Sequence, residues 1–278
     1  MMPPKLGIIA GGGLLPVRLA QYCLDTGRAV FAVLLAGQAT ETDFTGVPHA
    51  TYRLGAAGGV IKRFRAEGIS TLVFAGHVTK PKLADVRPDL WSAGFLLKTG
   101  VFGGGDDNFL QALIRALEGE GFTVIGADDI APDLLAPAGC MTKASPTDVN
   151  MQDIRAGLAA ARVLGARDAG QAVIAAEGKI VAEEDRRGTD AMLADAIGKR
   201  AAGGVLVKCM KPGQERRADL PAIGPETVAG VRAAGLAGIA VSAGHALILE
   251  RDACISAADA AGVFIVGVPL EDAEITRD

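Results

Sequence analysis

Short apolar runs alternate with amphipathic segments along the first half of the chain. Residues 6–10 form a continuous apolar run, which is typical of a parallel strand covered on both faces. Three glycines follow, and residues 14–25 then space their apolar side chains as a helix does. This alternation predicts a doubly wound, Rossmann-like parallel sheet over residues 1–131. Further strands are expected at 29–35, 70–75 and 122–125, and further helices at 60–67 and 106–118.

The second half of the chain has a different pattern. Two apolar runs, 171–176 and 179–183, flank a Glu-Gly pair and predict a β-hairpin. With the helices around them, such antiparallel strands predict a mixed α/β domain over residues 148–278. The other elements are expected as helices at 148–164, 190–200, 225–234 and 252–261, as strands at 204–208 and 263–266, and as a strand pair at 239–241 and 246–249.

Residues 132–147 separate the two patterns. This segment is rich in proline and has little hydrophobic periodicity. We therefore expect a linker that joins an N-terminal Rossmann-like domain to a C-terminal mixed α/β domain.

The composition limits the classes of function. The 278 residues carry a formal net charge of −4, and only 4% of them are aromatic, so the chain has neither a basic field nor an aromatic platform for nucleic acid. Its four cysteines are far apart, which argues against a zinc knuckle and a disulfide framework. No apolar run approaches the roughly 18 to 20 residues of a membrane span. We expect a cytoplasmic protein that does not bind nucleic acid.

The first candidate site is the glycine turn Gly11-Gly12-Gly13, between the first strand and the first helix. Backbone N–H groups and a helix N-terminus can hold a phosphate there, and glycine lets the anion approach closely. The third glycine of a dinucleotide fingerprint is absent, because Pro16 stands in its place, and the second strand ends without the acidic residue that binds a ribose. The turn is therefore a phosphate or nucleotide cradle, a ligand-free tight turn or, less favoured by the sequence, a nicotinamide-cofactor site.

The stretch 204–224 holds the highest density of chemically active side chains. A strand leads Lys208 and Lys211 into a Pro/Gly loop, where the two ammonium groups could clamp a diphosphate. Asp219 could bind Mg²⁺ or position a water molecule. The alternative is a solvated charged loop. Further substrate-binding candidates in this stretch are Gln214, Arg217, Ile223 and Gly224.

Two shorter segments add candidates. Gly188-Thr189-Asp190 opens a predicted helix; Thr189 or Asp190 is either an N-cap or part of a phosphate site, where Asp190 could share a metal with Asp219. A second segment follows the strand at 70–75, whose carboxyl end is where ligands bind in doubly wound sheets. Its candidates for substrate contact are Gly76, His77 and Lys80, although a lone histidine is more often structural.

Several short motifs follow one another along nearly the whole chain. They are LGIIAGGG at 6–13, FAGHVTKP at 74–81, GDD at 105–107, GQAV at 170–173, GTDAM at 188–192, VK at 207–208, KP at 211–212, DLPAIG at 219–224 and GLAG at 235–238. This ordered set resembles the LpxI-type UDP-2,3-diacylglucosamine pyrophosphatases of lipid A biosynthesis.

The resemblance implies hydrolysis of the pyrophosphate bond of UDP-2,3-diacylglucosamine to UMP and 2,3-diacylglucosamine 1-phosphate (lipid X). It implies Mg²⁺ or another divalent cation, a homodimer, and a lipid-linked nucleotide sugar as substrate, with transient contact to the inner membrane leaflet. Asp219, within DLPAIG, matches the critical acidic residue of the family. With it we expect Asp190, Lys208 and Lys211 to be catalytic, and Asp219 and Asp190 to bind the metal.

The chain departs from the family pattern at two positions. Arg187 and Ser242 stand where the family often has glutamate. Glu183, Glu184 and Asp185 are near enough in sequence to substitute for the first of these. The alternatives to a pyrophosphatase are a nucleotide-sugar binding or regulatory protein without hydrolysis, a Rossmann-type oxidoreductase, and a scaffold whose glycines serve packing alone.

Overall fold

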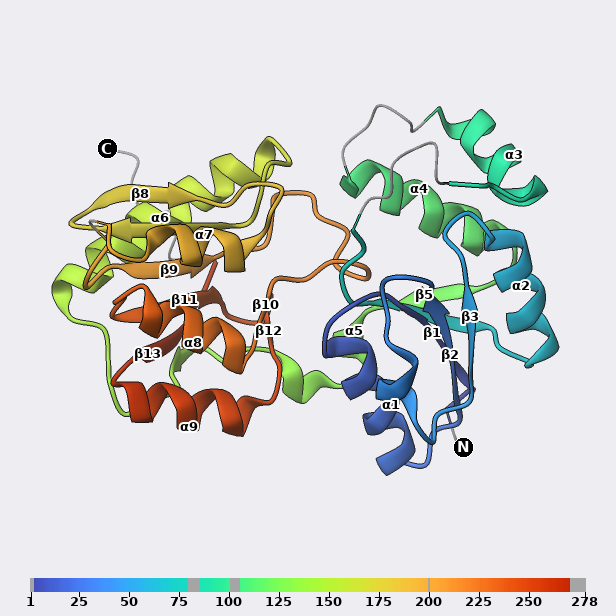
Figure 1. Ribbon diagram of the computed structural model, residues 1–278, viewed down its shortest axis with the longest axis horizontal. Coiled ribbons are helices and arrows are strands. Elements are labelled where there is room, and N and C mark those ends of the chain that lie inside the picture. Colours follow the sequence, from blue (N-terminus) through green and yellow to red (C-terminus); the bar gives the residue numbers. More distant parts are fainter. Residues whose placement is uncertain (1–2, 80–85, 101–105, 200, 271–278) are drawn as a thin grey trace. The chain divides into compact units, whose positions relative to one another are not determined.

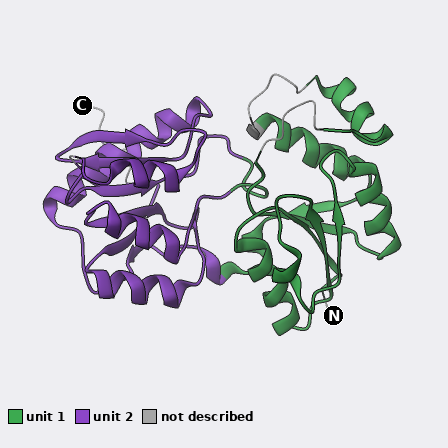
Figure 2. Cartoon of the chain, viewed as in Figure 1, with its two compact units in different colours: residues 1–132, 215–219 green, residues 133–214, 220–278 purple. Residues whose placement is uncertain are grey.

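The computed structural model describes residues 3–79, 86–100, 106–199 and 201–270. It divides the chain into two compact units (Figure 2). The first unit comprises residues 1–132 and 215–219, and the second comprises residues 133–214 and 220–278. Residues 215–219 thus belong to the first unit, although the chain on both sides of them belongs to the second.

The first unit contains a five-stranded sheet in the order β3-β2-β1-β4-β5, and all its strand pairs are parallel (Figure 1). This confirms the predicted doubly wound sheet. The strands are β1 (Leu6–Ala10), β2 (Val30–Leu35), β3 (His49–Tyr52), β4 (Thr71–Ala75) and β5 (Thr123–Ile125). The helical segments are α1 (Leu15–Asp25), η1 (Glu41–Phe44), α2 (Ala57–Ala66), α3 (Leu90–Thr99), α4 (Asp106–Gly119) and α5 (Ala127–Ile130).

Both faces of this sheet are covered by helices, as its apolar strands require. On one face, Phe64 of α2 and Ile114 of α4 pack with Phe31 and Leu72 of the strands. Leu19 of α1 is also fully buried, and α1 contacts β1, β2 and β4. Successive side chains of β2 point to opposite faces of the sheet. Because both faces are covered, all of its first five residues are buried.

The second unit contains a six-stranded mixed sheet in the order β6-β13-β11-β9-β7-β8. Strands β9, β11 and β13 are parallel, whereas β7, β8 and β6 pair antiparallel. The strands are β6 (Gly139–Cys140), β7 (Ala172–Ala176), β8 (Lys179–Glu183), β9 (Val205–Lys208), β11 (Gly238–Ser242) and β13 (Phe264–Val268), with a separate parallel pair, β10 (Ala222–Ile223) and β12 (Leu247–Ile248). The helical segments are η4 (Pro132–Leu134), which begins on the last residue of the first unit, α6 (Asp148–Ala166), α7 (Thr189–Ala196), α8 (Pro225–Ala233) and α9 (Arg251–Ala261).

Three local expectations differ from the structure. The segments 239–241 and 246–249 do not pair with each other, because β11 already has β9 and β13 on its two edges and β12 pairs with β10. The helix expected at 190–200 ends at Ala196, since Gly198 has a positive φ. The expected linker contains β6, which pairs with β13 at the sheet edge, so most of it belongs to the second unit.

Helix α6 packs against the sheet of the second unit through a glycine. A Cβ atom on Gly157 would lie 2.4 Å from Cγ2 of Val207, which is fully buried in β9.

No helix in the described part of the chain is long and apolar enough to cross a membrane.

We predict opposite effects for two helical glycines. Gly157→Ala should lower the free energy of unfolding by about 1–3 kcal/mol, because the added methyl overpacks the contact with Val207. Gly119→Ala, at an exposed position with nothing near, should raise it by up to about 1 kcal/mol through helix propensity. Urea unfolding measures both. Equal effects would contradict close packing of α6 on β9.

Candidate functional site

The first unit brings its candidate residues together at the carboxyl ends of two neighbouring strands. Gly11–Gly13 follow β1, and Gly76 and His77 follow β4. The chain runs from β1 through β2 to β3 on one side and continues with β4 and β5 on the other, so β1 and β4 flank the switch point of the sheet. Ligands of open parallel sheets bind at this position. Lys80, the remaining candidate of this group, lies outside the described residues.

Backbone hydrogen bonds join these two turns. The N–H of Gly11 donates to the carbonyl of Ala75 at 2.8 Å, while Gly12 and His77 exchange two bonds of 2.8 and 3.0 Å. A Cβ atom on Gly11 would lie 2.3 Å from the carbonyl oxygen of His77, and one on Gly76 would lie 2.4 Å from that of Gly12. The glycines are therefore needed for the approach of one turn to the other. The N–H groups of Gly11 and Gly12 are thus bonded to backbone carbonyls of the protein. This leaves Gly13 and the start of α1 to face an anion.

The start of α1 has the features of an anion-binding helix end. Its N-cap, Leu14, provides no side-chain cap, and the exposed Gly13 before it has φ +89°. The exposed His77 ring lies against the glycine turn, because a Cβ atom on Gly12 would be 2.8 Å from its Nε2. Gln38, after β2, fixes the backbone that follows His77. Its side-chain oxygen accepts from the N–H of Thr79 at 2.8 Å, and its side-chain nitrogen donates to the carbonyl of Thr79 at 3.2 Å. Gln38 is thus a positioning residue for this loop, and no motif in the sequence indicates that role.

In the second unit, Lys208 and Lys211 are both buried, with exposed fractions of 7% and 8%. The ammonium group of Lys208 donates to the carbonyl of Ala222 at 3.0 Å, and that of Lys211 lies 2.8 Å from Oδ1 of Asp168. In a solvated charged loop both lysine side chains would be exposed. The solvated-loop alternative is therefore wrong for Lys208 and Lys211. A buried ammonium group needs such partners to offset its desolvation.

A chain of polar contacts links Lys211 to the start of α7. The backbone N–H of Lys211 donates to Gln214 Oε1 at 2.9 Å, and Gln214 Nε2 lies 3.4 Å from Gln171 Oε1. The Gln171 N–H donates to Glu184 Oε2 at 2.7 Å, and the Thr189 hydroxyl donates to Glu184 Oε1 at 2.6 Å. The predicted Lys211, Gln214 and Thr189 thus share one network. Glu184, which the sequence named only as a substitute acid, is its central acceptor.

The segment Gly188-Thr189-Asp190 begins α7, but neither Thr189 nor Asp190 caps it. The N-cap is Gly188, at φ +85°, and no side chain accepts a bond there. Asp190 is exposed in the first turn. Asp190 belongs to the second unit and Asp219 to the first, so their shared metal site stays a prediction. Within the described ranges, no group of three or more His, Cys, Asp or Glu side chains is arranged to hold a metal.

Ion pairs hold the segment 215–219 to its unit. Arg216 pairs with Asp128 of α5 at 2.8 Å, and Arg217 pairs with Glu118 of α4 at 2.6 Å and with Glu215 at 2.8 Å. The hydrogen bonds from Arg217 hold the pKa of Glu215 below its usual value, against a smaller opposing effect of burial. The guanidinium of Arg217, a predicted substrate contact, thus anchors the segment that carries Asp219.

Asp219 itself ends this anchored segment. Its N–H donates to the carbonyl of Glu215 at 3.0 Å, which closes a helical turn, and the residue is half-buried. The next residues with predicted roles are placed differently. Ile223 is 1% exposed within the apolar core, and its carbonyl accepts from the N–H of Leu249 at 2.9 Å, so neither its side chain nor its carbonyl faces a ligand. Gly224 is the N-cap of α8.

The two departures from the family pattern have different surroundings. Arg187 is exposed and pairs with Asp185 at 2.9 Å and with Asp195 at 2.7 Å. Ser242, at the end of β11, is fully buried, and its hydroxyl has no hydrogen-bond partner in the described part of the chain. The first is therefore a surface ion-pair cluster, and the second is an uncharged buried position near the β9 loop, since Val241 pairs with Lys208.

Fold and site together define a two-unit α/β protein, in which a Rossmann-like unit presents a glycine turn and a mixed α/β unit buries two lysines at the end of a parallel strand. The model of the LpxI N-terminal domain matches residues 5–134, and that of the LpxI C-terminal domain matches residues 137–266. A curated relative, the UDP-2,3-diacylglucosamine pyrophosphatase LpxI of Caulobacter vibrioides, is 41% identical over 277 residues, which cover 96% of this chain and 99% of the relative. The chain belongs to the LpxI family.

Two solved structures show distant likenesses. The UDP-glucose 4-epimerase of Thermus thermophilus in complex with NAD is 19% identical over 52% of this chain and 41% of its own, with a TM-score of 0.27. The precorrin-6A reductase CobK is 16% identical over 96% of this chain and 89% of its own, with a TM-score of 0.32. Scores this low carry no argument about function.

The junction of the two turns in the first unit is testable with alanine. Gly76→Ala should lower the free energy of unfolding by about 2–5 kcal/mol, because the methyl group meets the carbonyl of Gly12 and φ is +85°. Gly37→Ala, at φ +75° with no atom within 4 Å, should cost only the conformational part, about 1–2 kcal/mol. Urea unfolding of both variants separates the contact from the backbone strain, and equal losses would contradict the close approach of the turns.

The ion pair of Arg217 with Glu215 predicts a pH effect. Because the pKa of Glu215 is lowered in the folded state, the pair stabilises the protein above the usual glutamate pKa of 4.5, and this stabilisation is lost as pH falls through the lowered value. Arg217→Met should return the pKa of Glu215 toward 4.5 and flatten the acid side of the stability profile. NMR titration of the Glu215 carboxyl carbon measures the shift, with Arg232→Met as the control. An unchanged Glu215 titration in Arg217→Met would refute this assignment.

Proposed function

We propose that this protein hydrolyses the pyrophosphate bond of UDP-2,3-diacylglucosamine and releases UMP and 2,3-diacylglucosamine 1-phosphate. The observation that carries the proposal is the 41% identity to a pyrophosphatase of that name over 96% of the chain, together with matches to both LpxI domains. A local similarity confined to one unit would support only a nucleotide-binding fold. Here the matched ranges contain the glycine turn, the two buried lysines and the segment of Asp219.

The charges in the second unit suit a diphosphate. A diphosphate carries negative charge that repels an attacking water, and cations fixed nearby reduce this repulsion as charge develops in the transition state. Lys208 and Lys211 are held in place by Ala222 and Asp168, so they are oriented before the substrate arrives. We propose that they stabilise the diphosphate. Gln214 and Thr189, in the polar network that also includes Lys211, are proposed to bind the rest of the head group.

Asp219 is the proposed catalytic carboxylate. Its segment is fixed by the ion pairs of Arg216 and Arg217, which suits a group that must orient a water molecule or hold a cation. Mg²⁺ is usually bound in proteins through one or two carboxylates together with substrate phosphates. Asp219 would hold the ion, with Asp190 as a second proposed ligand. A bound Mg²⁺ supplies neutralisation of the diphosphate charge.

The Rossmann-like unit offers the proposed second part of the substrate site. Gly13 and the uncapped start of α1 present backbone N–H groups, and His77 adds a ring that can donate a hydrogen bond. These groups suit a phosphate or the uridine. Gly11, Gly12 and Gly76 take part by letting the two turns approach.

The experiment compares three proteins for UMP release from UDP-2,3-diacylglucosamine with Mg²⁺, with and without EDTA. We expect Asp219→Asn to lower kcat by at least about 100-fold, because the lost carboxylate orients water or cation in the transition state. Asp252→Asn, which removes an exposed carboxylate of α9, is the matched control and should keep wild-type activity. Circular dichroism establishes that each variant is folded.

The possible results separate the functions. EDTA-sensitive release that Asp219→Asn abolishes supports the pyrophosphatase and its metal. Tight substrate binding without release by wild type would favour the non-hydrolytic nucleotide-sugar binding protein. Full activity in Asp219→Asn would remove Asp219 from the mechanism while leaving the reaction in place.

A further inference from the structure

Helix α3 of the first unit presents leucine side chains to solvent. Its sequence, LWSAGFLLKT, is apolar nearly throughout. Leu90 is 95% exposed and Leu97 is 85% exposed, whereas Ser92 and Phe95 are buried. Residues seven positions apart lie on the same side of a helix, so the two leucines stand on one face, about two turns apart. The sequence pattern alone does not show this face, because apolar residues occupy both sides of the helix.

The opposite side of α3 is fixed to its neighbours. The Trp91 ring stacks on that of Phe95, with centroids 5.7 Å apart, and Phe95 meets Phe109 of α4 edge to face at 5.9 Å. The Trp91 Nε1–H donates to Glu120 at 2.7 Å. The exposed leucines therefore project from a helix that is held in place by aromatic packing.

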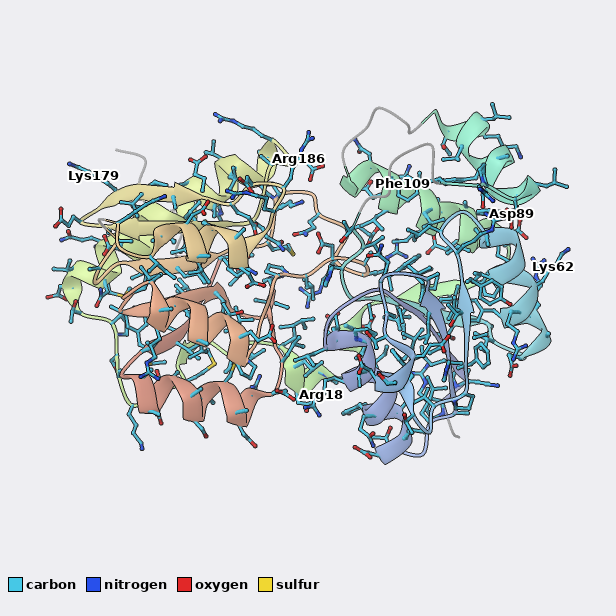
Figure 3. All side chains as sticks on the ribbon, in the orientation of Figure 1. Arg18, Lys62, Asp89, Phe109, Lys179 and Arg186 are labelled. Carbon is cyan, nitrogen blue, oxygen red and sulfur yellow. The ribbon has the colours of Figure 1, made fainter. Side chains whose placement is uncertain are left out.

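A cap fixes the start of the same helix. The carboxylate of Asp89 accepts hydrogen bonds from the N–H groups of Ser92 at 2.8 Å and Gly59 at 3.1 Å, which ties α3 to α2 (Asp89 and Phe109 are labelled in Figure 3). Figure 1 shows α3 at the margin of the first unit, beside α2 and α4. The leucine face is therefore a surface of a rigid element.

Exposed cations stand at both ends of α3 and on the neighbouring helix. Arg87 precedes the helix, Lys98 stands in its last turn, and Lys62 belongs to the adjoining helix α2; all three side chains are exposed, and Lys62 projects away from α2 (Figure 3). Exposed leucines flanked by lysine and arginine are the composition of a helix that lies in the interface of an anionic membrane. A second copy of the chain fits less well, because a two-fold axis through this face would bring cations of the same sign together.

We infer that α3 docks on an anionic lipid surface, with Leu90 and Leu97 inserted between the lipid head groups. This inference rests on the proposed function, since a substrate with two acyl chains is presented by a lipid surface. Binding to the membrane is reversible, because two leucines bury little area compared with a stable protein interface. The docked helix would bring the first unit to the surface that holds the substrate.

The chain contains its own probe for this contact. Trp91 is the single tryptophan of the sequence and lies on α3 itself. We would titrate the protein with vesicles of phosphatidylethanolamine and phosphatidylglycerol that contain brominated phosphatidylcholine, without nucleotide sugar, and follow quenching of Trp91. Vesicles of phosphatidylcholine alone test the need for anionic lipid. Sedimentation with the vesicles gives the partition coefficient independently of fluorescence.

The variants are Leu97→Glu and, as a second test of the same face, Leu90→Glu. Each should lower the partition coefficient at least about tenfold, because a charged group replaces a leucine that the lipid would bury. Val163→Glu, at a position of α6 that is 53% exposed, is the matched control and should partition as wild type does. Since both leucines are already in solvent, the melting temperatures should stay close to that of wild type.

Two results would overturn the inference: wild type that does not bind anionic vesicles, or binding that neither leucine variant weakens. Loss of dimers in the leucine variants without any vesicle binding would assign the face to a second copy instead. UMP release from substrate in vesicles and in detergent micelles tests the link to the reaction. We expect Leu97→Glu to be slow on vesicles only; a wild-type protein that binds vesicles but releases no UMP from either would refute the proposed function and leave the docking in place.

Discussion

A buried ammonium group needs hydrogen-bond acceptors to offset its desolvation, and the second unit supplies an acceptor for each of two lysines, one at the end of a strand and one just after it. Lys208 is held by the carbonyl of Ala222, and Lys211 by the carboxylate of Asp168. The backbone of Lys211 also fixes Gln214, from which contacts continue through Gln171 to Glu184. The position of the polar network therefore follows from where the lysines are buried, and that is at the carboxyl end of β9.

The first unit meets a different constraint, which is steric. The turns after β1 and β4 come so close that Gly11 and Gly76 have no room for a Cβ atom. The contact consumes the N–H groups of Gly11 and Gly12, which a reading from the sequence assigns to a ligand. It also places His77 against the turn. Glycine at these positions thus serves packing directly and a ligand only indirectly, by shaping the end of the sheet.

The parallel sheet and most helices could be predicted, because their apolar residues follow the period of the element. Strand β3 was missed, since its residues are only partly buried and give no apolar run. The predicted pairing of residues 246–249 with residues 239–241 is wrong, because strand pairing depends on which sheet edge is free. Hydrophobic periodicity carries no such information. Arg217 shows the same limit for the site: its charge is readable from the sequence, but its pairing with Glu118, 99 residues earlier, is not.

The two departures from the family pattern have a common electrostatic direction. A glutamate at position 242 would be a buried anion at the end of β11, the strand next to that of Lys208. Serine leaves an uncharged hydroxyl there, so the lysine-bearing end of the sheet keeps more positive potential. At position 187 arginine adds a cation, but Asp185 and Asp195 pair with it in solvent and screen its effect. Of the two changes, the buried one acts more strongly on an anion, because a buried charge is less screened than an exposed one. In the proposed reaction, serine at 242 would therefore attract a diphosphate more strongly than glutamate would, and the proposed carboxylate chemistry would be left to Asp219.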